Sequence, residues 1–338
     1  MRNRRLLLRL AALGALHMTV LFAGFIAPRD PGHQDRELAY APPTRLHFID
    51  SAGFCWRPFV YAWVPDGNGY REDSTRRFFL QPLVRGDDYK LLGCVRSNLH
   101  LFGVKAPAQV SLLGRDAYGR DEFSRLLMGG QISLAAGLLA TLVTLGTATL
   151  IGSVSGYFGR WIDEVLMGGG EFFLSLPWFY FLVAVRAFLP LHLSSTWTFF
   201  LLISVIGVVG WARPARLVRG VVLSARQRNY VLAARGFGAS DFYLLRKHIL
   251  PATYGVLLTQ AALLVPQYVA AEATLSFFGL GISDGIPSWG NMLSALREYN
   301  LLISYWWLMA PACGLFVTSV MYWLLADALH HWLQSHSI

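Results

Sequence analysis

The sequence predicts an all-α polytopic membrane protein that carries a small β-rich insert near its N-terminus. The chain of 338 residues is 54% hydrophobic and only 14% charged, with a mean hydropathy of +0.43. This composition is too apolar for a soluble domain. A membrane-spanning helix needs roughly 20 mostly apolar residues, and six segments of the chain qualify. A third observation is a long segment between the first two of them, whose residues have strand and turn character instead.

The six predicted spans cover residues 6–27, 133–156, 165–185, 196–212, 249–271 and 301–326. Arg2, Arg4, Arg5 and Arg9 precede or begin the first span, which favours a cytoplasmic N-terminus. Residues 1–27 are expected to form an uncleaved anchor, because a cleavage site after Ala27 would place Phe25 where a small residue is needed. Six spans from this start return the C-terminus to the cytoplasm.

Residues 28–112 are predicted to form the β-rich insert on the extracytoplasmic side. Residues 59–64 are aromatic or β-branched, and the Asp-Gly-Asn-Gly sequence at 66–69 indicates a hairpin turn to a second strand at 77–80. Cys55 and Cys94 both fall in this insert, where they either form a disulfide or remain two free thiols; the disulfide is the favoured interpretation. No spacing of Cys and His residues indicates a metal site.

A short basic segment, residues 222–250, lies between the fourth and fifth spans. Eight Lys or Arg residues and one acid, Asp241, fall between positions 213 and 247, as expected for a cytoplasmic loop. Tyr230, Ala233, Ala234 and Phe237 recur at helical spacing, which predicts a helix with a face suited to another protein's groove.

The same segment has the signals of a turn and a second helix. Gly236 and Gly238 permit a tight turn, and Ser240 or Asp241 can cap the helix that leads to Pro251. The alternative interpretation is an ordinary cytoplasmic loop, whose basic residues reflect only its side of the membrane and which has no docking role.

The residues of this loop resemble a known motif. Ala233, Ala234, Gly238, Leu250 and Pro251 are similar to the EAA loop of permease subunits in binding-protein-dependent ABC importers, with Leu232 at the position of the family's usual Glu. In that family the loop couples the membrane subunit to its ATPase. The resemblance implies a set of ATPase-coupling residues, which are Tyr230, Ala233, Ala234, Phe237, Gly238, Asp241 and Pro251.

Two further motifs are similar to those of dipeptide and oligopeptide importer permeases, and specifically of their second permease subunits. The first, at 113–134, contains Asp116, Gly119, Arg120, Asp121, Ser124, Arg125 and Gly129, with departures at Arg115 and Gln131. Its charges are interpreted as anchoring the second span, and Phe123, Leu126 and Leu127 suit a helix lying in the membrane interface. The second motif, at 271–293, resembles an extracytoplasmic re-entrant segment.

The resemblance implies a type I ABC importer-like permease core at residues 113–338, in the cytoplasmic membrane of a bacterium. Its expected partners are a second permease, two ATPase subunits, an extracytoplasmic solute-binding protein and membrane lipid. No cofactor is expected. Possible residues of the translocation path are Gln260, Gln267 and Glu272. The two glutamines suit interhelical hydrogen bonds equally well, and Glu272 must either pair or face a water-filled cavity.

Other functions fit the residues poorly. Lys90, Lys105 and Lys247 are followed by Leu, Ala and His, so no P-loop is possible. The net charge of +9 is spread along the chain without a basic stripe, which argues against nucleic-acid binding. Ser283 fits a G-x-S-x-G hydrolase motif, but an apolar helix is expected before it and Pro287 follows, whereas a nucleophile elbow needs a strand before it and a helix after it.

Overall fold

The structure is a computed structural model that describes residues 2–50, 53–67, 69–91, 93–188, 194–282 and 285–336. Its contacts divide the chain into two compact units. The first, here called the helical unit, comprises Met1–Leu13, Leu134–Leu275 and Thr318–Ile338. The second, the mixed unit, comprises Gly14–Ser133 and Ser276–Val317.

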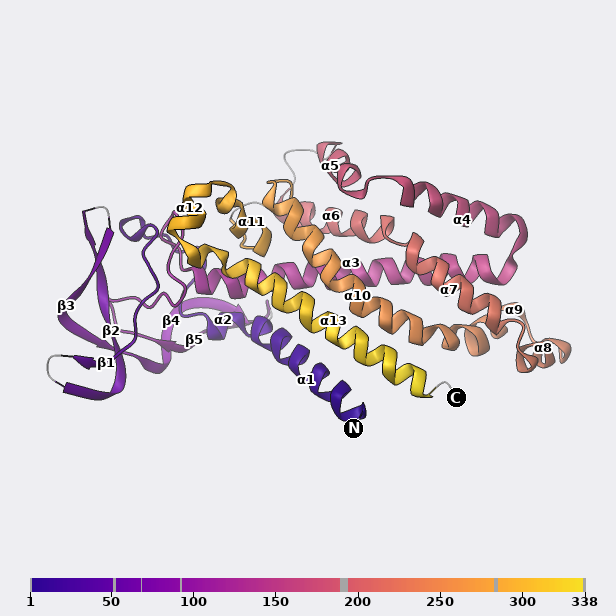
Figure 1. Cartoon of the computed structure of the whole chain (residues 1–338), viewed down its shortest axis with the longest axis horizontal. Coiled ribbons are helices and arrows are strands. Elements are labelled where there is room, and N and C mark those ends of the chain that lie inside the picture. The colour runs from indigo at the N-terminus through magenta and orange to yellow at the C-terminus, as the bar shows by residue number, and fades with distance from the viewer. Residues whose placement is uncertain are drawn as a thin grey trace. The chain divides into compact units, whose positions relative to one another are not determined.

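The described part of the mixed unit contains five strands and several short helices. Its strands are β1 (His47–Asp50), β2 (Gly53–Asp66), β3 (Gly69–Phe79), β4 (Gln81–Leu91) and β5 (Val95–Gly103). Its short helices are α2 (Ala23–Ile26), α11 (Trp289–Leu293) and α12 (Tyr299–Ser304), with 3-10 turns at Arg36–Leu38, Ser294–Arg297 and Trp306–Met309. The strands form an antiparallel sheet in the order β1-β2-β3 and a separate antiparallel pair β4-β5 (Figure 1).

The predicted β-rich character of the insert is confirmed. β2 and β3 pair through the predicted turn, with Asp66 opposite Gly69. The inner side of this hairpin contributes Val60 and Phe78 to a buried cluster with Ala108 and Val110, which closes the sheet against the chain that follows β5.

The structure does not pair Cys55 with Cys94, and their disulfide stays a prediction for direct measurement. Cys55 lies in β2 and Cys94 lies in the turn between β4 and β5, so the two residues belong to different sheets. Both are free in the structure, and Cys94 is exposed. The fact that both cysteines fall in the same insert did not reveal that they lie on different sheets.

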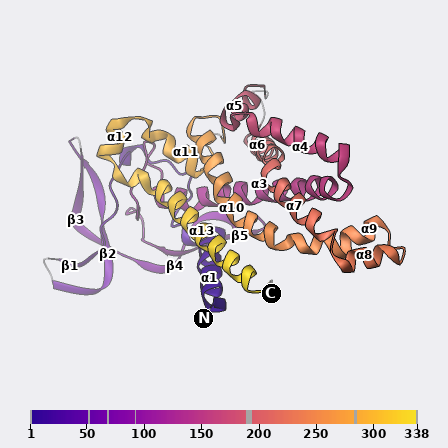
Figure 2. The ribbon, with the colours of Figure 1, turned by 45° about the vertical axis from the view of Figure 1, so that its right-hand side comes forward.

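The helical unit consists of long helices and two short ones. Its elements are parts of α1 (Arg2–Leu21), α3 (Glu122–Phe158), α10 (Leu250–Phe277) and α13 (Ala310–His336), together with α4 (Arg160–Ser175), α5 (Trp178–Phe188), α6 (Ser195–Val209), α7 (Ala212–Ala225), α8 (Asn229–Gly236) and α9 (Asp241–Leu244). A π-helical turn at Leu245–Ile249 joins α9 to α10. Both ribbon views show α8 and α9 beyond the end of α7, beside the start of α10 (Figures 1 and 2).

Length and composition support fewer spans than the six predicted. In the described part of the chain three helices qualify, namely 122–158, 241–277 and 306–335, or up to five if each of two bent pairs is one span. The bent pairs are 160–175 with 180–188, at 92°, and 196–209 with 212–225, at 43°. Helix α1 is not among them, and four of its 20 residues are arginines.

The breaks in the predicted segments have local causes. Pro177 follows α4 and has no N–H to continue its hydrogen bonds, which separates α4 from α5. The 196–212 segment bends at Gly210 and continues as α7 to Ala225, so the loop after it is shorter than the sequence suggested. The 301–326 segment is interrupted near Tyr305, and α13 begins at Ala310 with Pro311 in its first turn.

Candidate functional site

The basic segment folds as the predicted helix–turn–helix. α8 ends at Gly236, where the backbone N–H of Phe237 donates to the carbonyl of Ala233 at 3.0 Å. Gly238 then adopts φ +84°, a left-handed conformation that a residue with a Cβ adopts only with strain. The N–H of Ala239 donates to the carbonyl of Ala234 at 3.1 Å, which closes the turn.

The second helix begins where the sequence predicted. Ser240 is the N-cap of α9, and its side chain accepts a hydrogen bond from the backbone N–H of Tyr243. α9, the π-helical turn and α10 then run on without a break as far as Phe277. The turn is therefore rigidly continuous with a long apolar helix.

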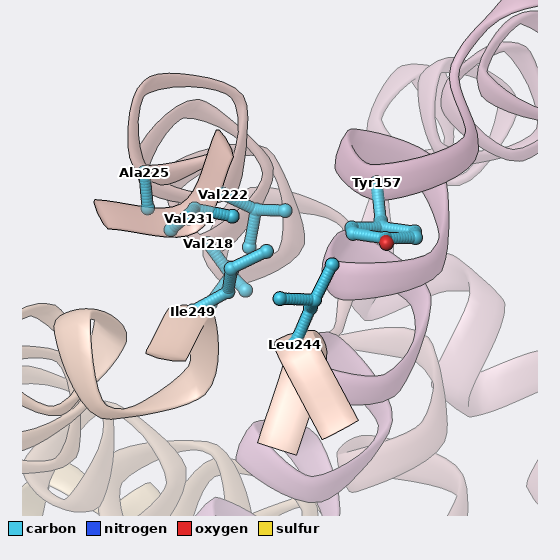
Figure 3. Close-up of a cluster of buried hydrophobic side chains, with 7 residues drawn as sticks. All are labelled: Tyr157, Val218, Val222, Ala225, Val231, Leu244 and Ile249. Atoms are coloured by element: carbon cyan, nitrogen blue, oxygen red, sulfur yellow. The ribbon is translucent and has the colours of Figure 1, made fainter. Parts of the chain in front are cut away.

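An apolar cluster holds the loop from its inner side. Val231 of α8 is 1% exposed, and Leu244 and Ile249 are fully buried. They pack with residues of two other helices, namely Tyr157 of α3 and Val218, Val222 and Ala225 of α7 (Figure 3). Burying side chains of this size contributes roughly 1.5–3 kcal/mol each, so the loop is part of the core of the helical unit.

A polar cluster reinforces the same contact. Arg235 donates to the Tyr157 hydroxyl at 2.6 Å and lies over its ring, while the hydroxyl donates to the Asp241 carboxylate. Arg235 and Asp241 themselves lie 3.6 Å apart, across the Gly238 turn. The end of α3 thus contacts both helices of the loop.

Two arginines bind neighbouring elements of the helical unit: Arg219 within α7, and Arg226 directly after it. The Arg226 guanidinium donates to the carbonyls of Gly156 and Tyr157 at 3.0 and 2.9 Å. The Arg219 guanidinium forms a bidentate ion pair with the Asp163 carboxylate of α4. Several positive charges of the segment are therefore used inside the unit.

The outer side of the loop presents large apolar side chains. Phe237 is 92% exposed and Tyr230 is 48% exposed. Leu232 and Phe242 are also exposed, at 49% and 73%. We call these four residues the apolar surface of the loop. Exposed apolar groups gathered on one short segment are typical of an interaction site.

The other predicted coupling residues are placed differently. Ala233 is exposed, whereas Ala234 is partly buried against the inner cluster. Asp241 takes part in the polar cluster, and Pro251 is exposed in the first turn of α10. The structure thus brings the predicted residues together but divides them between an inner and an outer side.

Two important residues of this site were not predicted for it. Tyr157 is 78 residues from Arg235 and 84 from Asp241, and no local pattern links them. Phe242 directly follows the predicted cap. It is exposed because Leu244, two residues later, is the side chain of this helix that packs into the buried cluster.

The two glutamines of α10 line one cavity. This cavity has a volume of about 380 Å³, and Gln260 and Gln267 share it with Arg213, Trp178 and Tyr268. The Tyr268 hydroxyl is bonded to Thr144 at 2.8 Å, which fixes one wall. Glu272 is buried further along α10 and is not among the residues described as lining this cavity. Ser283, the alternative nucleophile, lies outside the described residues.

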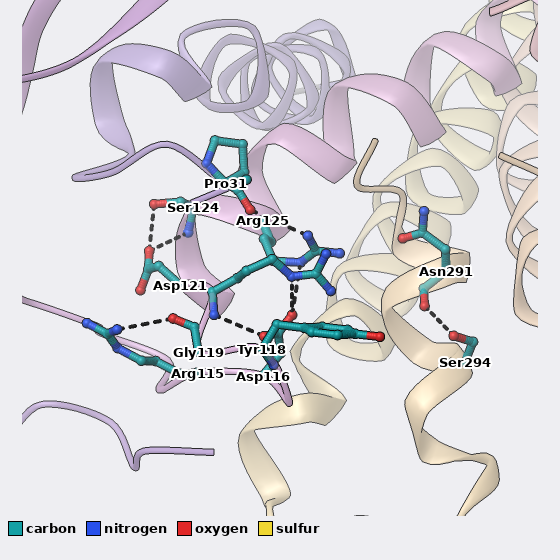
Figure 4. Close-up of polar contacts among 12 residues, drawn as sticks. Pro31, Arg115, Asp116, Tyr118, Gly119, Asp121, Ser124, Arg125, Asn291 and Ser294 are labelled. Carbon is teal, nitrogen blue, oxygen red and sulfur yellow. Dashed lines mark hydrogen bonds and ion pairs between the residues drawn. The ribbon is translucent and has the colours of Figure 1, made fainter. Parts of the chain in front are cut away.

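The charges of the 113–134 motif form a network in the mixed unit. Asp116 accepts a hydrogen bond from the Arg120 guanidinium at 2.6 Å. Its carboxylate also lies 3.6 Å from the Arg125 guanidinium (Figure 4). Asp121 caps α3 by accepting the backbone N–H of Ser124 at 2.8 Å, and burial raises the pKa of its carboxyl. This geometry supports the interpretation that the motif anchors the start of the second span.

The apolar residues that suit an interfacial helix belong to a longer helix. Phe123, Leu126 and Leu127 form the first turns of α3 itself, which continues to Phe158. Leu127 packs on Ala23 and Ala27, because α2 covers that face of the helix.

The 271–293 segment returns to the same part of α3. Trp289 is 2% exposed, its backbone N–H donates to Ser133 at 3.1 Å, and its indole N–H donates to the Leu126 carbonyl at 2.9 Å. A capping box between Ser288 and Asn291 starts α11 at this point. Gly129 permits the approach, since a Cβ there would lie 3.3 Å from the backbone of Ser288.

Apolar helices long enough to span a membrane, beside a loop that exposes apolar side chains, define the class: a polytopic membrane protein. Comparison with known proteins identifies the family. A family model described as "Binding-protein-dependent transport system inner membrane component" matches residues 148–336. The chain belongs to this family, and is therefore a permease subunit of an ABC importer rather than an ATPase.

Its relatives include named permeases of bacteria. The dipeptide transport system permease protein DppC of Bacillus subtilis is 35% identical over 66% of this chain and 68% of its own. The glutathione transport system permease protein GsiD of Pectobacterium atrosepticum is 33% identical over 67% and 72%. The oligopeptide transport system permease protein OppC of Bacillus subtilis is 34% identical over 67% and 72%.

Among solved structures, a chain of the methionine ABC transporter MetNI in an inward-facing form matches 60% of this chain and 95% of its own. The TM-score is 0.45 and the sequence identity is 17%. The family assignment rests on the sequence matches alone.

Proposed function

We propose that this chain moves a small peptide inward across a bacterial cytoplasmic membrane, by alternating access driven by partner ATPases. The observation that carries the proposal is the apolar surface of the loop, Tyr230, Leu232, Phe237 and Phe242, held from behind by a buried cluster. A rigid loop of this kind transmits the state of a docked ATPase dimer to the helices that carry it. The named relatives of this chain, which are dipeptide, oligopeptide and glutathione permeases, supply the substrate class.

The proposed assembly contains a second permease, two ATPase subunits and an extracytoplasmic solute-binding protein. We assign six spans to this chain, by counting α1 and both bent helix pairs as spans. Arginines at the start of α1 and along the 213–247 segment then favour cytoplasmic termini and a cytoplasmic loop.

The β-rich insert is proposed to contact the solute-binding protein at the outer mouth of the path. Of four aromatic residues that suit such a contact by type, Trp56 is 88% exposed, whereas Tyr61 is buried and Trp63 and Tyr70 are partly buried. Trp56 is therefore the best single probe of this contact, since aromatic side chains are enriched at interfaces.

The cavity beside Gln260 and Gln267 is the proposed part of the path in the helical unit. The cavity offers hydrogen bonds from the two glutamine amides, a positive charge from the Arg213 guanidinium and an apolar wall from the Trp178 ring. Such a mixture suits the backbone and carboxylate groups of a peptide.

The docking proposal is tested by truncating its most exposed residue. Phe237→Ala should weaken co-purification of the ATPase subunits by roughly 10- to 30-fold, because an aromatic residue at the centre of an interface contributes about 2 kcal/mol. Tyr254→Ala is the matched control, since Tyr254 is 59% exposed on α10 and lies outside the loop. Equal ATPase recovery from both variants would refute docking through Phe237.

A further inference from the structure

The start of α1 and the end of α13 enclose a small basic pocket in the helical unit, which the transport proposal does not use. Both ribbon views show these two helix ends side by side (Figures 1 and 2), and Arg9 of α1 bonds Asp327 of α13. The pocket has a volume of about 190 Å³. We call it the Arg5 pocket. Six residues line it, namely Arg5, Arg9, Asp327, Ala328, His331 and Trp332.

The carboxylate of this pocket is already engaged on both of its oxygens. The Nη1 atom of Arg9 donates to Oδ2 of Asp327 at 2.7 Å and to the Leu324 carbonyl at 2.6 Å. The other oxygen, Oδ1, lies 3.5 Å from Nε2 of His331. Asp327 therefore holds two basic side chains in place, and a cation entering the pocket would have to compete with both of them.

The positive groups, in contrast, have capacity to spare. Arg5 is exposed, and its guanidinium makes no hydrogen bond or ion pair within the part of the chain that the structure describes. Arg9 uses only Nη1 for its contacts among the described residues, so its Nε and Nη2 remain available. Two guanidinium groups against one carboxylate give the lining a net positive charge. Because guanidinium groups bind phosphate through parallel hydrogen bonds, the pocket is suited to an oxyanion.

The size and position of the pocket favour one phosphate group at the membrane surface. Sites for whole small molecules have volumes of about 300–1,000 Å³, and this pocket is smaller. It lies at the last turns of the helical segment 306–335, which is long and apolar enough to span a membrane. Lipid headgroups lie at the ends of such a segment. Trp332 on the lining is of a residue type that is enriched at this level.

Exposed apolar side chains continue from the pocket along both helices. Leu8 lies three residues after Arg5 on α1 and is 61% exposed, and Trp323 lies four residues before Asp327 on α13 and is 63% exposed. Residues at these spacings share a helix face. Both side chains lie toward the middle of their helices, where the acyl chains of a lipid run. A free phosphate ion has no group that would cover this apolar surface, whereas a phospholipid does.

We propose that the Arg5 pocket binds the phosphate of an anionic phospholipid of the phosphatidylglycerol type. Arg5 and the available nitrogens of Arg9 hold the phosphate oxygens, Asp327 positions Arg9, and the acyl chains lie against Leu8 and Trp323. The lipid thus joins α1 to α13 beside the Arg9–Asp327 ion pair. The inference rests on the proposed topology only for the leaflet, which is the cytoplasmic one; binding itself requires neither ATP nor a transported solute.

The test is a lipid titration of the purified, complete permease complex in an uncharged detergent, followed by native mass spectrometry. The probes are phosphatidylglycerol, phosphatidylcholine with the same acyl chains, and glycerol phosphate. Phosphatidylglycerol should bind at least about 5-fold more tightly than phosphatidylcholine, whose choline cation offsets the phosphate charge. Equal binding of the two lipids would overturn the proposal. Displacement of phosphatidylglycerol by an equal concentration of glycerol phosphate would identify a site for soluble phosphates and would also overturn it.

Variants then locate the site. Arg5→Gln removes an exposed charge without touching the Arg9–Asp327 ion pair, and should weaken phosphatidylglycerol binding by roughly 5-fold. Arg4→Gln is the matched control, because Arg4 is the preceding residue of α1, is also exposed and is not among the residues that line the pocket. Lipid bound elsewhere on the complex is the same in both variants, so their difference reports this pocket. Equal affinity of the two variants would refute the assignment.

The outcome is separable from that of the transport proposal. Gln260→Ala, in the other cavity of the helical unit, should slow ATP-driven uptake and leave the affinity for phosphatidylglycerol unchanged. Peptide uptake by a complex that does not distinguish phosphatidylglycerol from phosphatidylcholine would end the inference and leave the transport function standing.

Discussion

Replacement of Gly238 by valine should disturb the docking loop without disturbing the fold. Gly238 has φ +84°, and a Cβ built there meets no heavy atom within 4 Å. The cost is therefore backbone strain alone, about 1–3 kcal/mol for a β-branched residue in the left-handed region. The inner cluster of Val231, Leu244 and Ile249 is untouched, so we expect the chain to insert and assemble.

The strain is relieved if the turn changes shape, which moves Phe237 relative to α9. A penalty of 1–2 kcal/mol lowers the population of the native turn by roughly 5- to 30-fold. The measurement is peptide uptake per ATP hydrolysed by the complete complex in proteoliposomes. We expect the ratio to fall severalfold in Gly238→Val and less in Gly238→Ala.

Gly236→Ala provides the matched control. Gly236 lies two residues earlier at the end of α8, also has no heavy atom within 4 Å of a built Cβ, and does not have a positive φ. Alanine is favoured over glycine in a helix by roughly 0.5–1 kcal/mol, so this variant should couple normally. A Gly238→Val complex that transports with the wild-type ratio would show that the turn geometry has no role in coupling.

Other predictions concern contacts that the structure describes directly. Tyr157→Phe removes the hydroxyl shared by the two loop helices and should weaken coupling by severalfold at unchanged expression; an unchanged uptake ratio would contradict this role. Cys55 and Cys94 should both be alkylated without reductant, as intact-mass measurement will show, whereas one disulfide would restore the sequence-based prediction. Gly119→Ala should destabilise the chain by about 3 kcal/mol or more, because its Cβ would lie 1.8 Å from the Asp35 carbonyl oxygen. Thermal unfolding in detergent tests it, and an unchanged midpoint would be evidence against this close packing.

The sequence was most informative where short-range chemistry decides the structure. The Gly238 turn, the Ser240 cap and the hairpin at Asp66–Gly69 each depend on residues within a few positions of one another, and each is found as predicted. The apolar positions of α8 also predicted a helix, although periodicity alone did not separate its buried residue, Val231, from its exposed ones.

Contacts between distant segments were not predictable in the same way. The partner of Arg235 is a tyrosine at the end of α3, and the partner of Arg9 is Asp327 near the other end of the chain. The division of the five described strands into two sheets was likewise indicated by no local signal. The break at Pro177, in contrast, follows from an ordinary property of proline and was available in the sequence.

Under the proposed docking role, the two sides of the loop divide stability from coupling. Its inner residues are fixed by burial and by the Tyr157 contacts, so the loop has little freedom to move independently of α3 and α7. Its outer residues, Phe237 above all, make few contacts within the chain and can be covered by a partner at little structural cost. We therefore expect a displacement imposed on the outer side by a docked partner to be carried to the ends of α3, α7 and α10 instead of being absorbed by the turn. Substitutions on the inner side should therefore lower stability and coupling together, whereas substitutions on the outer side should lower coupling alone.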